Sequence, residues 1–551
     1  MGFLSFSSGR TALSLAFPLC FFSIFADEKP FPTAPRTICD VDLTQGNTGP
    51  GRVAGGIWKK GWQTTGAANE RIVSDAGRSL RLADYGERVD GPPPSPLRVH
   101  DGGRFLVDAE GRPVFLLSDT AWRLCTRPTR QEITDYLRKR RSQRFNAVAF
   151  VLMHTALDSN AYGDVPFRVV RGKHDPASPV VTCGRRPDDP AEYDYWDHVD
   201  FIIDQIKRLG MYAVVLPAWG DAVTGSYNGT DTSRIVFNEA NARVYGQWLG
   251  KRYQNQSHVI WMTGGDVAGA YSGRDYGPVF RAMAVGLLEG SRSMCPLLSF
   301  HPQKPNPRSS AWFQKDSWLS FNSIQAWPED QVPAVASDWD LLPAKPTWIF
   351  EGRYEAYYKN NYQPEQWGEW QVRFQAYQTV FSGAFGHTYG HERVFGFGND
   401  GWDWKRELDA PGACSMTHLA KLMNGIGEKN LLARMPAQDL VDGPEGMAER
   451  LVSDRITAMR TEDGNLALFY SANGRAVRVR MDRLAAKPMN AWWFNPRNGK
   501  WHADGVETTE QKSFTVGIPS GPGECTREFD PPGAPGDGND WVLVLCGSEG
   551  M

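Results

Sequence analysis

The chain has 551 residues, more than one average domain, which predicts two or three domains. A hydrophobic fraction of 41% and a charged fraction of 22% are typical of a soluble globular protein, and the net charge of −3 gives no basis for a nucleic-acid partner. The cysteines are scattered without C-x-x-C spacing, which excludes the common zinc and redox motifs.

The first 26 residues have the pattern of a signal peptide. Arg10 precedes the apolar stretch 11–25, and small residues surround a cleavage position after Ala26. A run of about 15 apolar residues is short for a membrane span. We therefore expect a secreted protein, extracellular or periplasmic, with no membrane association in its mature form. A membrane-anchored N-terminus is the alternative.

Residues 27–96 form a predicted N-terminal extension and linker. The segment is rich in Gly, Asp and Arg, shows little periodicity, and ends in the proline run of 91–96, which is typical of a stiff linker. Nothing in this segment indicates a function.

Residues 97–430 alternate between apolar runs and amphipathic segments, which predicts βα units and a parallel sheet. The predicted strands are 114–117, 147–152, 212–216, 259–262, 297–300, 319–324, 347–350 and 384–388. The predicted helices are 130–142, 193–209, 238–253, 279–288 and 365–381. Eight such strands favour a (β/α)8 barrel. An open doubly wound sheet is the competitor, but no Gly-rich phosphate loop follows the first strand.

From 431 to 551 the pattern changes to short alternating runs separated by turns such as Asp463-Gly464-Asn465. The predicted strands are 456–460, 466–470, 477–481, 491–494 and 541–545. This spacing is typical of an antiparallel β-sandwich. The predicted fold is thus an α/β barrel followed by a β-sandwich.

Two predicted barrel strands each end in an acidic residue. The run Val259 to Thr263 leads through Gly264 and Gly265 to Asp266, and Thr347 to Phe350 leads to Glu351. Barrel enzymes place their chemistry at these strand ends, and a pair of carboxylates is what cleavage of a glycosidic bond requires. Asp266 could instead cap a helix.

Other polar and aromatic residues follow the same strand ends and would converge on one cleft. Asp119 could equally cap a helix, and His387 could be a satisfied core histidine. His387 and His391 are four residues apart, but Gly390 disfavours the helix that a zinc motif needs, so we expect no metal and no cofactor. The candidate substrate-binding residues are Asp119, Trp122, His154, Trp219, His301, Gln325, Tyr354, Glu355, His387 and Tyr389.

These motifs resemble the apiosidase-like (β/α)8 glycoside hydrolases, which carry a C-terminal β-sandwich of the collagen-binding type. The resemblance rests on segments 111–122, 145–148, 264–266, 345–355 and 386–391, and on the turn 495–499 of the second domain. It covers about residues 100–550. One departure is Ile349-Phe350 before Glu351, where the family often has Asp-Gly.

The resemblance implies a secreted retaining glycosidase that releases apiose or another pentofuranosyl sugar from polysaccharide side chains. In that mechanism Asp266 is the acid/base and Glu351 the nucleophile. The alternative is a non-catalytic carbohydrate- or matrix-binding protein on a degenerate barrel. The sandwich would brace the barrel or bind a matrix ligand such as collagen. The sequence gives no oligomeric state.

Overall fold

The computed structural model describes residues 92–547, apart from 171, 227–230, 293–294, 304, 358–366, 399–400, 444–451, 486 and 504. The predicted signal peptide (1–26) lies outside the described residues, as does all but the last part of the predicted extension and linker (27–96). Among the described residues no helix is long and apolar enough to cross a membrane.

Eight parallel strands form the first sheet, in the order β11-β8-β7-β4-β3-β14-β13-β12. The two end strands, β11 and β12, meet through Ser320 N–H, which donates to the Leu298 carbonyl at 2.8 Å, and through the Ser299 hydroxyl, which donates to the Phe321 carbonyl at 2.6 Å. The sheet is therefore a nearly closed barrel, as predicted. Its strands are β3 (Leu116–Thr120), β4 (Ala147–Val151), β7 (Tyr212–Leu216), β8 (Val259–Val267), β11 (Leu298–Pro302), β12 (Asn322–Gln325), β13 (Thr347–Glu351) and β14 (Gly386–Tyr389).

Alternation along the strands separates the barrel interior from the helix layer. On β4, Ala147, Ala149 and Val151 face an interior cluster, whereas Val148 and Phe150 join the cluster that packs under the helices. Both sets are fully buried. This explains why the strands are continuously apolar in sequence.

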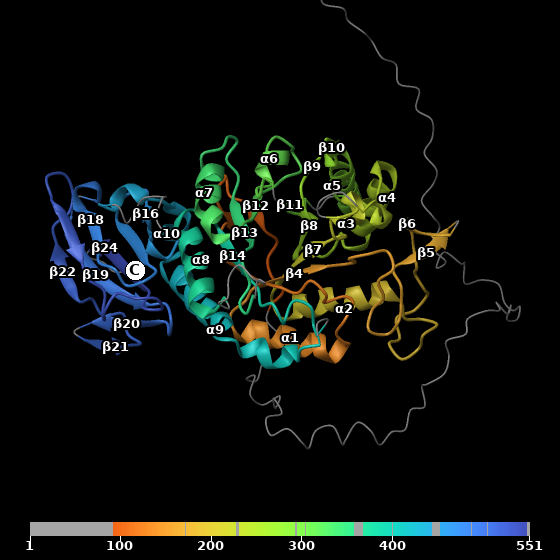
Figure 1. Cartoon of the computed structure of the whole chain (residues 1–551), viewed down its shortest axis with the longest axis horizontal. Helices are drawn as coiled ribbons and strands as arrows, with labels where there is room; N and C mark the ends of the chain where they lie inside the picture. Colours follow the sequence, from red (N-terminus) through yellow and green to blue (C-terminus); the bar gives the residue numbers. More distant parts are fainter. Residues whose placement is uncertain are drawn as a thin grey trace, which may run out of the picture. The chain divides into compact units, whose positions relative to one another are not determined.

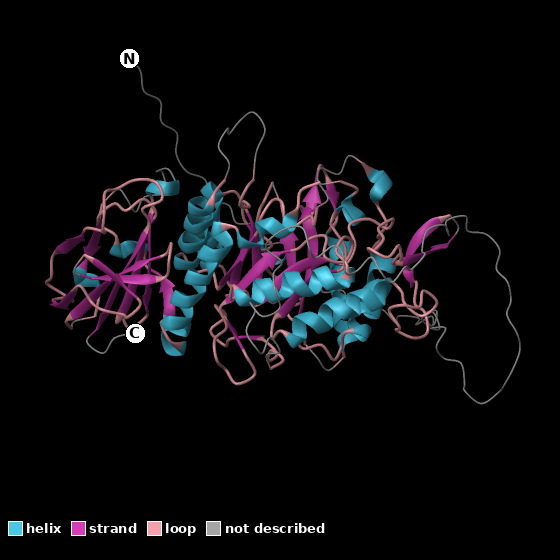
Figure 2. Cartoon of the chain, turned by 90° about the horizontal axis from the view of Figure 1, so that it is seen from below, coloured by secondary structure: helices cyan, strands magenta, loops and turns pink. Residues whose placement is uncertain are grey.

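Helices cover the outside of the barrel (Figures 1 and 2). The first helix begins with a capping box, in which the Thr129 side chain accepts from the Glu132 N–H and Glu132 accepts from the Thr129 N–H. The main helices are α1 (Arg130–Ser142), α2 (Tyr195–Arg208), α4 (Glu239–Arg252), α5 (Gly277–Ser291), α7 (Pro328–Trp339), α8 (Glu369–Phe381) and α9 (Pro411–Gly425). Three short helices are α3 (Asp221–Thr224), α6 (Ser310–Phe313) and α10 (Glu428–Ala433).

Small hairpins decorate the barrel. One pairs β1 (Arg98–Val99) with β2 (Leu106–Val107), and its neighbours Leu97 and Phe105 pack onto the interior cluster. A second hairpin, inserted between β4 and α2, pairs β5 (Phe167–Val170) with β6 (Lys173–Pro179). A third follows β8 and consists of β9 (Ala270–Tyr271) and β10 (Arg274–Asp275).

The second domain has a large antiparallel sheet and a two-stranded sheet, with a separate apolar core that contains residues of both. The predicted boundary at 430/431 falls inside α10, just before the first strand of this domain. The large sheet contains β15 (Arg434–Pro436), β16 (Ile456–Thr461), β17 (Leu466–Ser471), β24 (Trp541–Gly547), β19 (Met489–Asn495), β20 (Lys500–Ala503) and β21 (Val506–Thr508), with β22 (Thr515–Ile518) beside β19. The small sheet pairs β18 (Val477–Arg480) with β23 (Thr526–Phe529).

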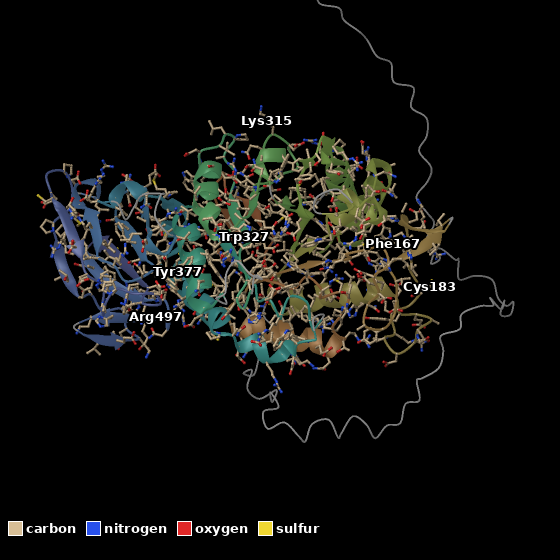
Figure 3. The ribbon with its side chains drawn as sticks, in the orientation of Figure 1. Phe167, Cys183, Lys315, Trp327, Tyr377 and Arg497 are labelled. Atoms are coloured by element: carbon tan, nitrogen blue, oxygen red, sulfur yellow. The ribbon has the colours of Figure 1, made fainter. Side chains whose placement is uncertain are left out.

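Helix α8 carries the contact between the barrel and this domain. Arg373 forms a two-pronged ion pair with Asp540, with both N–O distances 3.0 Å, and both side chains are almost completely buried. Tyr377, which Figure 3 labels, stacks on Tyr470 with ring centroids 4.9 Å apart. The two domains thus share a buried polar and aromatic interface.

Candidate active site

Asp266 is presented by a bulge at the end of β8. Opposite β11, His301 pairs with Gly264 but Pro302 pairs with Val267, so two residues of β8 have no partner. Gly264 and Gly265 have φ of +88° and +118°, and a Cβ on Gly264 would lie 2.4 Å from the His301 carbonyl oxygen. Asp266 itself has φ of +52°. The glycine pair therefore allows the strand to turn and point Asp266 into the barrel mouth.

Glu351 ends β13 and is held by the residues around it. The pairing with β12 also shifts register, because Ile324 pairs with Ile349 and Gln325 pairs with Glu351. One Glu351 oxygen accepts a hydrogen bond from the Tyr354 hydroxyl at 2.5 Å, and Trp122 Nε1–H donates to that hydroxyl at 2.6 Å. The residue is 8% exposed and lines the barrel mouth.

His301, at the end of β11, joins the two acids. Its Nδ1 accepts the Asp266 backbone N–H at 3.0 Å, so the proton of the neutral ring lies on Nε2. Nε2 is 2.8 Å from the second Glu351 oxygen and donates to it. Burial lowers the pKa of His301 to about 4, so the ring stays neutral at physiological pH. This histidine fixes the backbone of one acid and the side chain of the other.

The two carboxyl groups share one weakly solvated site. Burial, with the neighbouring Glu351 charge as a second cause, raises the pKa of Asp266 to about 7. Burial also raises the pKa of Glu351, but hydrogen bonds from Tyr354 and Gln325 oppose the rise. Gln325 also donates to Asp266. Because two like charges so close cannot both form easily, the site holds one proton near neutrality, and the donors around Glu351 favour leaving that proton on Asp266.

Asp266 lines both lobes of one open cleft. The larger lobe has a volume of about 500 Å³ and contains Glu351; the smaller has a volume of about 360 Å³ and lies on the β7 side. Asp266 and Gln303 line both. The larger lobe is also lined by Gln325, Trp327, Arg353, Tyr354, Tyr357 and Phe395, and the smaller by Trp219, Asp221, Ser226, Asp231 and Arg234.

Several predicted substrate contacts lie in or directly under this cleft. Gln325 and Tyr354 line the larger lobe, and Trp219 lines the smaller. Trp122 is nearly buried beneath them, edge-on to both Trp219 and His301. His154 stacks on Trp219 with ring centroids 5.1 Å apart, and its Nε2 lies 3.0 Å from the Trp122 carbonyl. Trp122, His154 and His301 therefore support the cleft wall and do not form its surface.

Four other predicted substrate contacts lie outside the cleft. Asp119 is completely buried on the helix side of β3, where it pairs with Arg140 of α1 at 2.5 Å. The Tyr389 hydroxyl donates to Glu355 at 2.5 Å, and Glu355 also accepts the Gly412 N–H of α9.

His387 pairs in register with Leu117 and Ile349, and both of those side chains pack against helices. The prediction that Asp119, Glu355, His387 and Tyr389 contact a sugar therefore disagrees with their positions. Asp119, His387 and Tyr389 point into the layer between barrel and helices, because neighbouring positions on a strand face opposite sides. Glu355 lies after the end of β13 and is held in the same layer by Tyr389 and by the Gly412 N–H of α9.

The sequence interpretation missed part of the cleft wall. Gln303 directly follows β11 and Trp327 follows β12, so their positions after strand ends could have indicated them. Arg353 packs against the rings of Trp327 and Trp367, with its guanidinium carbon 4.1 and 4.4 Å from the ring centroids. Tyr357 and Phe395 come from loops, where no spacing rule applies.

Asp266, His301 and Glu351 each place one ligating atom within 4.8 Å of the other two, as a metal site would. The imidazole does not fit this role. Its Nδ1 already accepts the Asp266 N–H and its Nε2 donates to Glu351, so a cation would have to displace one of these bonds. The arrangement suits proton transfer and nucleophilic attack.

Comparison with known proteins agrees with this geometry. The family model "Apiosidase-like, catalytic domain" matches residues 100–427, and "Putative collagen-binding domain of a collagenase" matches 435–546. A glycoside hydrolase family 5 crystal structure from Bacteroides vulgatus is 27% identical, with a TM-score of 0.68, and the match covers 82% of this chain and 93% of that one. A structure described as a glycoside hydrolase is 26% identical, with a TM-score of 0.69 and coverage of 83% and 98%. No curated protein sequence matches the chain.

Proposed function

Because the chain belongs to the apiosidase-like family and is a glycosidase, we propose that it hydrolyses its substrate with retention of anomeric configuration. The observation that carries this proposal is the close approach of the two acids. The ligating oxygens of Asp266 and Glu351 lie within 4.8 Å of each other. Retaining enzymes hold their carboxyl groups about 5–5.5 Å apart, whereas inverting enzymes leave about 6.5–9.5 Å for a water molecule.

The reaction proceeds in two displacements. A Glu351 oxygen attacks the anomeric carbon while the bond to the leaving oxygen breaks, and Asp266 gives that oxygen its proton. Water then attacks the same carbon, passes a proton to the Asp266 carboxylate, and releases Glu351. Tyr354 and His301 hold Glu351 in the position that attack requires.

We further propose that the released sugar is apiose or a related terminal pentofuranosyl residue of a polysaccharide side chain, and that the protein is secreted. The family match supports the sugar class, and the apolar segment before Ala26 supports secretion. The Arg373–Asp540 pair supports a bracing role for the second domain.

The test uses 4-nitrophenyl β-apiofuranoside, α-arabinofuranoside and β-galactofuranoside, together with pectic polysaccharides. We expect release of at least one sugar, with the first product of retained configuration in the NMR spectrum. Glu351→Gln and Asp266→Asn should each lower turnover of the glycan by at least about 1000-fold. The surface variant Glu289→Gln is the control and should retain wild-type activity.

Azide separates the roles of the two acids. With an aryl glycoside, azide should rescue Glu351→Ala and give an inverted glycosyl azide, because azide takes the place of the nucleophile. It should rescue Asp266→Ala and give a retained glycosyl azide, because azide attacks the glycosyl-enzyme. An inverted first product from the wild type would refute the retaining mechanism. Failure to release any sugar would favour a non-catalytic binding protein.

A further inference from the structure

The tyrosine that donates to the nucleophile lies on a short segment, 352–357, which follows β13. The ring of Tyr354 packs against the backbone just after β14, since a Cβ on Gly390 would lie 2.3 Å from its Cδ1. The segment then turns at Ala356, whose φ of +61° is uncommon for a residue other than glycine. The direction of the Tyr354 hydroxyl therefore depends on the path of this segment.

Glu355 fixes that path from the position next to the tyrosine. The residue is only 5% exposed. One of its side-chain oxygens accepts from the Tyr389 hydroxyl at 2.5 Å, and the other accepts from the Gly412 N–H at 3.0 Å. Its backbone N–H donates to the Gly390 carbonyl at 2.9 Å, and its carbonyl accepts the Glu392 N–H at 2.9 Å. These four bonds tie the segment to β14, to the loop after it and to α9.

The surroundings of Glu355 are suited to an acidic side chain. Burial raises the pKa of Glu355, whereas the hydrogen bonds from Tyr389 and Gly412 oppose the rise. Gly412 lies in the first turn of α9, where the helix dipole favours a negative charge. Arg140 attracts the carboxylate and Glu369 repels it. Because this acid does not face the cleft, its role lies in the segment that it anchors.

A second buried side chain anchors the segment on the other side of the tyrosine. Gln375 of α8 is 3% exposed. Its Oε1 accepts the Arg353 N–H at 3.1 Å, and its Nε2 donates to the Arg353 carbonyl at 2.7 Å. Tyr354 therefore lies between two anchored residues, Arg353 and Glu355.

We propose that Glu355 is a positioning residue for the nucleophile. By tying the segment 352–357 to α9 and to β14, it aims the Tyr354 hydroxyl at Glu351. This inference rests on the proposed function and adds a residue outside the cleft on which that function depends. Glu355 itself touches no reacting atom.

The acidic limb of the pH–rate profile tests this role, with the 4-nitrophenyl glycoside that the wild type cleaves. Glu351 must be ionised to attack, and the hydrogen bond from Tyr354 lowers its pKa. Tyr354→Phe should therefore lower kcat/KM about 100-fold and move the acidic limb to higher pH. Glu355→Ala should lower kcat/KM about tenfold and move the limb in the same direction. Glu355→Gln can accept from the Gly412 N–H and donate to the Tyr389 hydroxyl, so it should recover most of the activity.

A double variant separates positioning from a general loss of packing. Once the Tyr354 hydroxyl is absent, its direction has no effect on the nucleophile. Tyr354→Phe combined with Glu355→Ala should therefore stay within about threefold of Tyr354→Phe alone. Asp266 and His301, the other titratable groups that contact or face Glu351, are the same in every variant.

Two tyrosine variants give a matched comparison. Tyr389→Phe removes only the donor to Glu355, so it should move the acidic limb to higher pH by a smaller amount than Glu355→Ala. The control is Tyr377→Phe, at the position labelled in Figure 3. The Tyr377 hydroxyl is also buried but has no hydrogen-bond partner among the described residues, so its removal should leave the profile unchanged.

The indole of Trp122 gives a readout that needs no substrate. Its N–H donates to the Tyr354 hydroxyl at 2.6 Å, so its signal in a nitrogen–proton NMR spectrum reports where that hydroxyl lies. The signal is assigned by its absence in Trp122→Phe. We expect Glu355→Ala to shift it in the same direction as Tyr354→Phe, and Glu355→Gln and Tyr377→Phe to leave it in place.

Either an unshifted acidic limb or an unshifted indole signal in Glu355→Ala would refute the positioning role. Multiplying losses in the double variant would refute it as well. If Glu355→Ala does not fold, Tyr389→Phe is tested by the same two measurements. If the indole signal shifts as expected while the wild type cleaves no glycoside, the proposed function is wrong, but the hold of Glu355 on Tyr354 stands.

Discussion

A single histidine controls the geometry of both acids. Removing the His301 ring deletes the acceptor for the Asp266 N–H and the donor to Glu351. We predict that His301→Ala lowers kcat/KM by about 100-fold. Without the donor the nucleophile is a weaker acid, so the acidic limb of the pH–rate profile moves to higher pH. His301→Gln, which can donate and accept, should recover part of the loss. An unchanged acidic limb would show that His301 is only a packing residue.

The basic limb of the pH profile belongs to Asp266. The general acid must hold a proton, and its pKa is raised to about 7, so kcat/KM should fall as the pH rises through about 7. Asp221 is one of the charges that raise this pKa. Asp221→Asn should therefore shift the limb to lower pH, as a pH–rate series would show. A limb that Asp221→Asn does not shift would contradict this assignment.

The buried Asp266 carboxyl also lowers the stability of the folded protein at high pH. The native pKa of Asp266 is about 7 against an ordinary value of 3.8, so between these pH values the folded state keeps a proton that the unfolded state has lost. Stability from this group is present at low pH and is lost as the pH rises toward about 7. Asp266→Asn should raise the free energy of unfolding on the order of 1–3 kcal/mol at pH 8 and little at pH 4. Thermal unfolding at both pH values tests the sign.

At the scale of elements, the bulge of β8 depends on two glycines. A Cβ at Gly264 would clash with the backbone of β11, and its φ of +88° is also unfavourable for other residues. Gly273, on the hairpin that follows, has a φ of +79° and open space around it. Gly273→Ala should therefore lower the free energy of unfolding by only about 1 kcal/mol. Gly264→Ala should lower it several times as much and should abolish the activity of the molecules that still fold. Denaturant titration, combined with an activity assay, distinguishes the two variants. Equal losses of stability would show that a side chain at Gly264 does not clash with β11.

The barrel strands were predictable from the sequence because they are buried on both faces, so each is a continuous apolar run between polar segments. Helix α7 was missed because Pro333 lies inside it, and prolines normally end helices. The strands β20 to β23 were missed because they are short and include exposed positions. β20 alternates but has only four residues, whereas β21, β22 and β23 lack the alternation that identifies a half-buried strand.

The site was predictable to the level of strand ends but not of side-chain direction. Asp266 and Gln325 face the cleft, whereas Asp119 and Tyr389, also at strand ends, point to the helices. A shift of one residue along a strand moves a side chain from the cleft side to the helix side. The sequence does not show where a bulge causes such a shift. Loop residues such as Phe395 depend on long-range packing that periodicity does not contain.

At the scale of the whole molecule, the Arg373–Asp540 pair should couple the two domains. Both side chains are buried, and Tyr470 also donates to Asp540 at 3.0 Å. Asp540→Leu would leave the buried Arg373 with only the half-exposed Glu369 as an ion-pair partner, at 3.5 Å, and should lower the free energy of unfolding by about 3–5 kcal/mol. The double variant Arg373→Met, Asp540→Leu should have a free energy of unfolding much closer to that of the wild type. Calorimetry should show one unfolding transition in the wild type; additive losses in the double variant would contradict coupling.

The position of β24 has a consequence for biosynthesis. Residues 541–547 follow every other strand of the large sheet in sequence, yet β24 lies between β17 and β19 and pairs with both. While the chain emerges from the ribosome, the two halves of that sheet have no common neighbour and expose the strand edges that β24 will cover. Asp540 directly precedes β24, so the buried ion pair with Arg373 of α8 also forms only after this segment is made. A nascent chain truncated before residue 540 should carry a folded barrel with an open sheet attached, a state prone to aggregation.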